Sequence, residues 1–355
     1  PSLEVDPSTV GERPEGPPPM PEGLKPDAAS PVSLHPHPVI ALAASPWAPL
    51  AAVSGHAAVV RDDTEAADYL GSLPFPEGAP HVLKFSRDGN LLLAAGGRGA
   101  HSGKVVIWDI VSCERVAEVG EDEIDSVLAA DISADRKYVA LGGTDKILKV
   151  FTLADGELVH RIKKHTDWVT AIEFSPDGST VASGDRNGGV HTWDADSGSI
   201  VFTLAEHDKR VSDLAWRPDG KMLASVAEDG KLVLWEMEEG FPTRTATPHK
   251  GKGGSNGNGA GASTPGVLSV DYSDKGALVS AGRDGAVTLM RSDTNPEARI
   301  ESFEEFPTAA VFAHDGSRLV TGDFLGNVGF WAITREKGNA TIEEIEALST
   351  KVASK

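Results

Sequence analysis

The fold is decided by the stretch Val169-Thr170-Ala171-Ile172-Glu173-Phe174-Ser175-Pro176-Asp177-Gly178. Its first six residues alternate and are rich in β-branched and aromatic types, which indicates a short strand, and Ser-Pro-Asp-Gly indicates a tight turn. The turn phrase returns with starting positions 45, 86, 133, 175, 217, 273 and 313, so that successive copies are 41, 47, 42, 42, 56 and 40 residues apart. The copies at 86, 175 and 217 are the clearest, and the copy at 45 lacks the Asp-Gly. A repeat of about 40–45 residues containing short strands is typical of a β-propeller blade.

Each repeat contains several short apolar runs and predicts one four-stranded blade. Seven repeats therefore predict an all-β, seven-bladed β-propeller over residues 39–332, with essentially no helix inside that span. Only three runs are evident in the last repeat, so its fourth strand comes from Val32-Ser33-Leu34 or from residues after Ala332. We favour the N-terminal strand, because joining both chain ends in one blade would fasten the ring.

The third run of several repeats ends in Trp-Asp or a related pair, as at Trp108-Asp109, Trp193-Asp194, Trp235-Glu236 and Trp331-Ala332. These pairs and their spacing resemble the WD-repeat family over roughly residues 39–332. The resemblance implies that each blade is held by a hydrogen-bonded network. Its members are a His before the first strand, a Ser or Thr in the second, an Asp in the next turn, and the Trp.

The repeats match this implied network to different degrees. The fifth repeat is complete, with His207, Ser225, Asp229 and Trp235. The fourth has His165, Ser183 and Trp193, but Asn187 stands where the Asp is expected. The sixth has Ser280, Asp284 and a displaced His249, with Met290 in the place of Trp. His, Ser and Asp also form hydrolase triads, but we interpret these sets as structural, because satisfied polar networks specify protein cores.

Composition excludes several classes of function. A formal net charge of −20 and a pI near 4.9 argue against nonspecific nucleic-acid binding and favour a basic partner or a role in solubility. The single cysteine, Cys113, allows no internal disulfide and no zinc site built from cysteines. No stretch approaches the roughly 20 apolar residues of a membrane span. We therefore expect no membrane insertion, no metal and no cofactor.

Two tails flank the predicted ring. Residues 1–38 contain 11 of the 23 prolines and few apolar residues, which predicts an extended linker or strap. Residues 333–355 are predicted to form a tail with a short helix over residues 340–355. Thr341 and Glu344 fit a capping box, and Ile342 and Ile345 begin an apolar stripe. The predicted domains are thus 1–38, 39–332 and 333–355.

Loops of unusual length point to one face of the ring. The 56-residue step contains a Gly-rich insertion at residues 251–264, and the 47-residue step contains an enlarged turn at 96–103 and an acidic loop at 120–125. In WD-repeat rings, the loops between blades and the loops joining second and third strands open on the same face. Arg and Trp often carry interface energy, and recurring residues of this face include several of them. We predict that this face binds a partner through Arg98, Trp168, Asp185, Arg186, Arg210, Arg283, Asp323 and Phe324. The alternative is that these residues recur only because the repeats are duplicated.

Several segments resemble one subfamily. Residues 41–50, 73–78, 161–171 and 182–186 are similar to the propeller part of planctomycete-type proteins that join an N-terminal c-type cytochrome domain to a WD-repeat ring. Residues 16–24 resemble their linker. The resemblance implies a bacterial, periplasmic or otherwise extracytoplasmic protein with a c-type cytochrome among its candidate partners; a cytoplasmic location is the alternative. This chain lacks Cys-x-x-Cys-His, so it cannot attach haem covalently, and a cleaved domain or a separate subunit would carry the haem.

The sequence therefore predicts a noncatalytic protein–protein interaction scaffold, a structural subunit of a larger extracytoplasmic assembly with cytochrome-type partners. The alternative is a propeller enzyme, a hydrolase or a dehydrogenase, with its site in the central channel. We find no nucleophile motif in a suitable context and no convincing pairs of carboxylates in repeat register to support that alternative.

Overall fold

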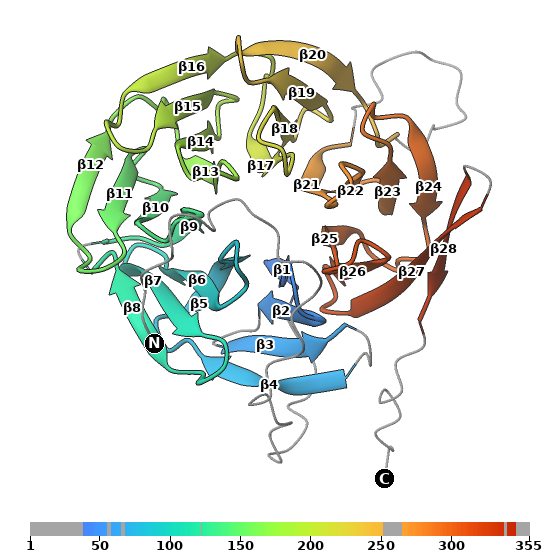
Figure 1. Cartoon of the computed structure of the whole chain (residues 1–355), viewed down its shortest axis with the longest axis horizontal. Helices are drawn as coiled ribbons and strands as arrows, with labels where there is room; N and C mark the ends of the chain where they lie inside the picture. The colour runs from blue at the N-terminus through green and yellow to red at the C-terminus, as the bar shows by residue number, and fades with distance from the viewer. Residues whose placement is uncertain are drawn as a thin grey trace.

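Seven four-stranded antiparallel sheets form a ring around a central axis (Figure 1). The structure, a computed structural model, describes residues 38–54, 58–64, 68–121, 123–250, 265–336 and 339–345. Over these residues it contains strands and no helix. The prediction of an all-β, seven-bladed β-propeller is confirmed.

Each blade runs from an inner strand near the axis to an outer strand at the rim, and its strands pair in chain order (Figure 1). Blades 1 to 3 consist of β1 Leu42–Ala44, β2 Leu50–Ser54, β3 Ala58–Asp63 and β4 Asp68–Pro74; β5 Ala79–Phe85, β6 Leu91–Arg98, β7 Ser102–Asp109 and β8 Arg115–Val119; β9 Val127–Ile132, β10 Tyr138–Gly143, β11 Leu148–Thr152 and β12 Leu158–Ile162. Blades 4 and 5 consist of β13 Val169–Phe174, β14 Thr180–Asp185, β15 Val190–Asp194 and β16 Ile200–Leu204; β17 Val211–Trp216, β18 Met222–Ala227, β19 Leu232–Glu236 and β20 Phe241–Ala246. Blades 6 and 7 consist of β21 Val267–Tyr272, β22 Leu278–Gly282, β23 Ala286–Met290 and β24 Pro296–Ile300; β25 Pro307–Phe312, β26 Arg318–Asp323, β27 Val328–Glu336 and β28 Asn339–Glu344.

The recurring turn phrase is explained by its local hydrogen bonds. The Ser175 hydroxyl donates to the Asp177 carboxylate at 2.5 Å and accepts the Thr180 backbone N–H at 3.0 Å. Gly178 has a φ of +76°, a conformation that glycine adopts without steric cost. The phrase therefore joins the first strand of a blade to the second and fixes where the second begins.

The hydrophobic core is divided among the interfaces between blades. Seven clusters of buried side chains occur, one at each blade–blade contact around the ring. The cluster between blades 7 and 1 includes Val39, Leu42, Val320 and Phe330. Packing across this last contact closes the ring.

Blade 7 takes its fourth strand from the C-terminal side. β28 pairs with β27, with Ile333 opposite Ile342, and the Ile345 N–H donates to the Phe330 carbonyl at 2.8 Å. The predicted closure by an N-terminal strand is therefore wrong, because β28 already occupies the free edge of β27. The N-terminal segment instead contacts the inner part of the blade, where the Val39 N–H donates to the Asp323 carbonyl at 3.1 Å.

The predicted C-terminal helix is also not found, since residues 339–344 form β28. Thr341 and Glu344, expected to cap that helix, are exposed residues of the strand. The remainder of that prediction, residues 346–355, lies outside the described residues. So do the Pro-rich residues 1–37, including Val32-Ser33-Leu34 and the linker-like segment 16–24, and the Gly-rich insertion 251–264.

Polar networks hold the second and third strands of blades 4 to 6. In blade 5, His207 Nε2 lies 2.8 Å from the Ser225 hydroxyl and Nδ1 lies 3.1 Å from the Asp229 carboxylate, while Trp235 Nε1 donates to Ser225 at 2.8 Å. In blade 6, His249 occupies the same place, 3.0 Å from Ser280 and 2.8 Å from Asp284, although the long insertion separates it from them.

Blade 4 builds its network with a different carboxylate from the one expected. His165 Nε2 lies 2.7 Å from the Ser183 hydroxyl, and Trp193 Nε1 donates to that hydroxyl at 2.9 Å. His165 Nδ1 faces the Asp185 carboxylate at 3.1 Å, so Asp185 takes the role that Asn187 cannot fill. All members of this network are buried, which fits a structural role.

A second set of carboxylates joins neighbouring inner strands. Asp131 accepts the Phe174 N–H at 2.7 Å, Asp213 accepts that of Val270 at 3.0 Å, and Asp271 accepts that of Phe312 at 2.8 Å. In each pair the donor belongs to the next blade. These contacts join consecutive blades near the axis of the ring.

Candidate functional site

One face of the ring brings together the loops between blades and the loops that join second and third strands. A repeated backbone hydrogen bond places them: the residue after the second strand donates its N–H to the carbonyl of the residue before the first strand. The pairs are Arg186 to Trp168 at 2.9 Å, Glu228 to Arg210 at 2.9 Å, Arg283 to Gly266 at 3.0 Å and Phe324 to Phe306 at 3.2 Å. Within each of these blades, the residues at the two positions therefore lie next to one another.

These side chains form a continuous line across blades 4 to 7, which we call the arc and define as Trp168, Arg186, Arg210, Glu228, Arg283, Phe306 and Phe324. The Arg186 guanidinium lies over the Trp168 ring, 4.7 Å from its centroid. Arg210 and Arg283 approach the Glu228 carboxylate at 3.6 and 3.2 Å.

Aromatic contacts continue the arc into blade 7. The Arg283 guanidinium lies 5.8 Å from the centroid of the Phe306 ring, and the Phe306 and Phe324 rings are 5.0 Å apart. Trp168 and Phe324, at the two ends, are 39 % and 47 % exposed. The arc thus presents aromatic ends and a charged middle on a rigid scaffold.

The charged middle of the arc contains more cations than anions. Burial lowers the pKa of Arg210; the Glu228 carboxylate opposes this shift, while the positive charges of Arg283 and Arg186 add to it. The Arg210 Nε is buried and has no hydrogen-bond partner in the described structure. The positive charges of Arg186 and Arg283 thus both act on Arg210, and the Glu228 carboxylate lies between Arg210 and Arg283.

Five of the eight residues predicted to bind a partner lie in the arc: Trp168, Arg186, Arg210, Arg283 and Phe324. Arg98 occupies the same repeat position in blade 2, is exposed, and reaches the Pro76 carbonyl at 3.4 Å. It lies on the same face but makes no hydrogen bond, ion pair or ring contact with the arc among the described residues, so the structure separates it from the other arginines.

Asp185 and Asp323 require a correction, because their side chains do not reach the surface. They are 1 % and 3 % exposed. Asp185 accepts the N–H groups of Asn187 and Gly189, both at 2.9 Å, and Asp323 accepts those of Leu325 and Asn327 at 2.9 and 2.8 Å. Each aspartate shapes the loop that presents its exposed neighbour, so both support the face from beneath.

Sequence reasoning missed Glu228 and Phe306. Glu228 follows the second strand of blade 5 and shares the repeat position of Arg186 and Arg283; Phe306 precedes β25 at the position of Trp168. The repeat register was a usable signal for both. The prediction followed the arginines that recur at these positions and did not include every residue that the register places there.

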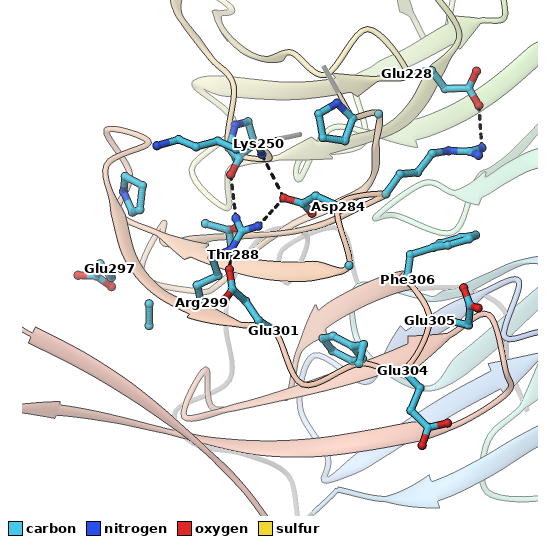
Figure 2. A pocket seen from close by; sticks show the side chains of 18 of the residues that line it. Glu228, Lys250, Asp284, Thr288, Glu297, Arg299, Glu301, Glu304, Glu305 and Phe306 are labelled. Atoms are coloured by element: carbon cyan, nitrogen blue, oxygen red, sulfur yellow. Dashed lines mark hydrogen bonds and ion pairs between the residues drawn. The ribbon is translucent and has the colours of Figure 1, made fainter. Parts of the chain in front are cut away.

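A groove of about 1410 Å³ adjoins the arc over blades 5 to 7. Arg283, Glu228 and Phe306 line it together with Arg299 and Asp284. Figure 2 shows Arg299 directed at Asp284 and Glu301, with Glu304 and Glu305 near Phe306 on the opposite side. Arg299 also donates to the Thr288 hydroxyl at 3.1 Å and to the Pro248 carbonyl at 3.3 Å, so its positive charge is already compensated.

Neither a cluster of metal-binding side chains nor a membrane-spanning helix is found among the described residues. No three His, Cys, Asp or Glu side chains there are placed to share a metal ion. The described part of the chain also has no helix that is long and apolar enough to cross a membrane.

Comparison with known proteins supports the assignment of the fold. A family described as "WD domain, G-beta repeat" matches residues 156–194 and 198–236. Each match starts just before the outer strand of one blade and ends with the third strand of the next, at Trp193-Asp194 and Trp235-Glu236. A search of curated proteins found no match. Two matched repeats within a ring of seven four-stranded sheets fit a WD-repeat β-propeller.

Proposed function

We propose that this protein is a protein–protein interaction scaffold and that the arc is its main contact surface. The observation that carries the proposal is the row of exposed and half-buried aromatic and arginine side chains across four blades of a rigid ring. Trp and Arg are the side chains most enriched among residues that dominate binding energy. Loops on a rigid framework are common sites of recognition. WD repeats generally mediate protein–protein interaction, which supports the same conclusion.

We further propose an extracytoplasmic location and a partner of the cytochrome type. Support comes from the resemblance of residues 41–50, 73–78 and 161–171 to propellers that accompany c-type cytochrome domains. Fractionation of the native organism with periplasmic and cytoplasmic markers tests the location. Detection of a haem-containing protein among cross-linked partners tests the proposal of a cytochrome-type partner.

A catalytic site at the axis has less support. Asp131, Asp213 and Asp271, which face neighbouring inner strands, already accept backbone N–H groups. Their arrangement fits the mechanical task of joining blades. WD-repeat propellers are typically noncatalytic, in keeping with a scaffold.

The scaffold proposal is tested by replacing Trp168 and Arg186 with Ala in the full chain and measuring copurification of the native partner. We expect partner recovery to fall by about tenfold or more, because loss of a Trp and an Arg from a contact surface typically costs more than 1.4 kcal/mol. Arg98→Ala is the matched control: it removes an exposed arginine from the same repeat position outside the arc. Equal partner recovery by a folded double variant and by wild type would overturn the proposal and direct attention to the two tails.

A further inference from the structure

The charged middle of the arc has an uncompensated positive charge. Arg210 and Arg283 share the Glu228 carboxylate at 3.6 and 3.2 Å. Arg186 is exposed, lies over Trp168, and has no carboxylate within ion-pair distance among the described residues. Three guanidinium groups and one carboxylate leave a local charge of +2 at pH 7, in a chain whose formal net charge is −20.

Neighbouring charged groups do not remove this excess. Asp167 accepts the Trp168 N–H at 2.8 Å and lies 4.0 Å from the Lys146 Nζ, so a cation already accompanies it. Lys209, beside Arg210 in the chain, is exposed and adds further positive charge. The acidic pair Glu304 and Glu305 lies at the blade 7 end, near Phe306 (Figure 2). The positive region is therefore confined to blades 4 to 6.

The geometry of the arginines suits a carboxylate. A guanidinium presents N–H groups in a planar fork that matches the two oxygens of a carboxylate. Arg186 is held in place by its contact with the Trp168 ring, and its guanidinium is exposed. The exposed Trp168 ring adds an apolar surface directly beside the cations.

We propose that the arc recognises an acidic segment of a partner protein. An Asp or Glu side chain of that segment binds between Arg186 and Arg210, and a neighbouring apolar side chain packs on Trp168. This inference rests on the proposed scaffold function and specifies the chemistry of its partner. It replaces the expectation of a basic partner drawn from net charge alone: at physiological ionic strength the Debye length is about 8 Å, so the contacting groups outweigh distant charges.

The local positive charge is measurable through Trp168. It is 39 % exposed, whereas the other six tryptophans are at most 9 % exposed, so ionic quenchers of tryptophan fluorescence report mainly on this residue. We expect iodide to quench the full chain more efficiently than caesium, despite the net charge of −20. Arg186→Glu should reverse this order, whereas Arg98→Glu, with the same change in net charge, should leave it unchanged. Stronger quenching by caesium in the wild type would overturn the inference.

Binding is tested with three fluorescent peptides that differ only in charge. Each contains a Leu, and the residues next to this Leu are Glu in the first peptide, Gln in the second and Lys in the third. The full chain should prefer the Glu peptide. Arg186→Glu should lower the affinity for the Glu peptide by about tenfold or more, as expected for loss of a charge-assisted contact. Arg98→Glu should leave this affinity unchanged. Equal or tighter binding of the Lys peptide would overturn the inference. Displacement by millimolar phosphate but not by acetate would assign the cations to a phosphorylated ligand and also overturn it.

The inference and the scaffold proposal fail in different ways. If Trp168→Ala abolishes copurification of the native partner but the protein does not prefer the Glu peptide, the arc is an interface and the inference of an acidic ligand is refuted. If Trp168→Ala leaves copurification unchanged, the interface itself is refuted.

Discussion

The Nζ of Lys84 lies 3.9 Å from the Oε2 of Glu173, although Lys84 belongs to blade 2 and Glu173 to blade 4. The contact therefore spans the axis of the ring. Burial alone would lower the pKa of Lys84, but the surrounding carboxylates raise it above its ordinary value. Burial raises the pKa of Glu173 to about 8; Lys84 opposes this shift, and Asp131, Asp213 and Asp271 add to it. The axis is thus lined by acidic groups that resist ionisation together.

We expect Glu173→Gln to change the pH dependence of stability. The ordinary glutamate pKa of 4.5 rises to about 8 in the folded protein, so the contribution of Glu173 to stability is fully present below about pH 4.5. It is lost as the pH rises through 8, because the folded state then holds an ionised, buried carboxylate. Between pH 5 and 9 the wild type should lose up to about 4 kcal/mol relative to the variant, since about three units of the pKa shift lie in this range. Urea unfolding across this range measures the difference, and parallel curves would refute the assignment.

The carboxylates that bridge blades predict a contrast between two substitutions of Asp271. Asp271→Ala removes the acceptor of the Phe312 N–H and should cost about 1–3 kcal/mol, since a buried donor is left without a partner. Asp271→Asn keeps an acceptor and should cost much less. Burial raises the pKa of the Asp271 carboxyl group to about 6, whereas the amide of the Asn variant does not ionise and stays neutral at every pH of the experiment. Equal losses in urea unfolding for both variants would show that the bond to Phe312 does not stabilise the ring.

The network of blade 6 predicts sensitivity to acid. Burial alone would raise the pKa of Asp284, but hydrogen bonds from His249 and Arg299 lower it to about 2. Its contribution is therefore present above the ordinary value of 3.8 and is lost as the pH falls through 2. We expect Asp284→Asn to cost on the order of 2 kcal/mol at pH 6, with the difference disappearing near pH 2. Thermal unfolding between pH 2 and 6 measures this convergence, and a difference that stays constant with pH would contradict it.

The strand β28 predicts opposite outcomes for adjacent residues. Ile342 packs against the cluster between blades 6 and 7, whereas Thr341 is exposed. Ile342→Asp should lower stability by about 2 kcal/mol, because it places a charge against an apolar cluster. Thr341→Asp, the matched control, should change it by less than about 0.5 kcal/mol. Calorimetry measures both, and similar melting temperatures for the two variants would show that the pairing with β27 contributes little.

Local chemistry made much of the fold predictable. The phrase Ser175-Pro176-Asp177-Gly178 contains its own hydrogen bonds and its left-handed glycine, so its recurrence marked the blades before any tertiary contact was known. In blade 5, the standard spacing of His207 and Ser225 was enough to place the network. The same reasoning identified Trp168 and Arg186 as residues of one face, because a repeat register carries a position from blade to blade.

The sequence by itself therefore determined the number of blades and their turns, since these depend on contacts within one repeat. Only the tertiary structure decided the rest. Ala340 and Ile342 have the two-residue spacing of a strand face, and Ile342 and Ile345 have the three-residue spacing of a helix face. The free edge of β27 favoured the strand, because it offered hydrogen bonds to β28. Asp185 replaced Asn187 in its network, and Glu228 came to lie between Arg210 and Arg283, because folding brought together atoms from different loops and blades. Such contacts depend on how the ring closes in space, which no single repeat specifies.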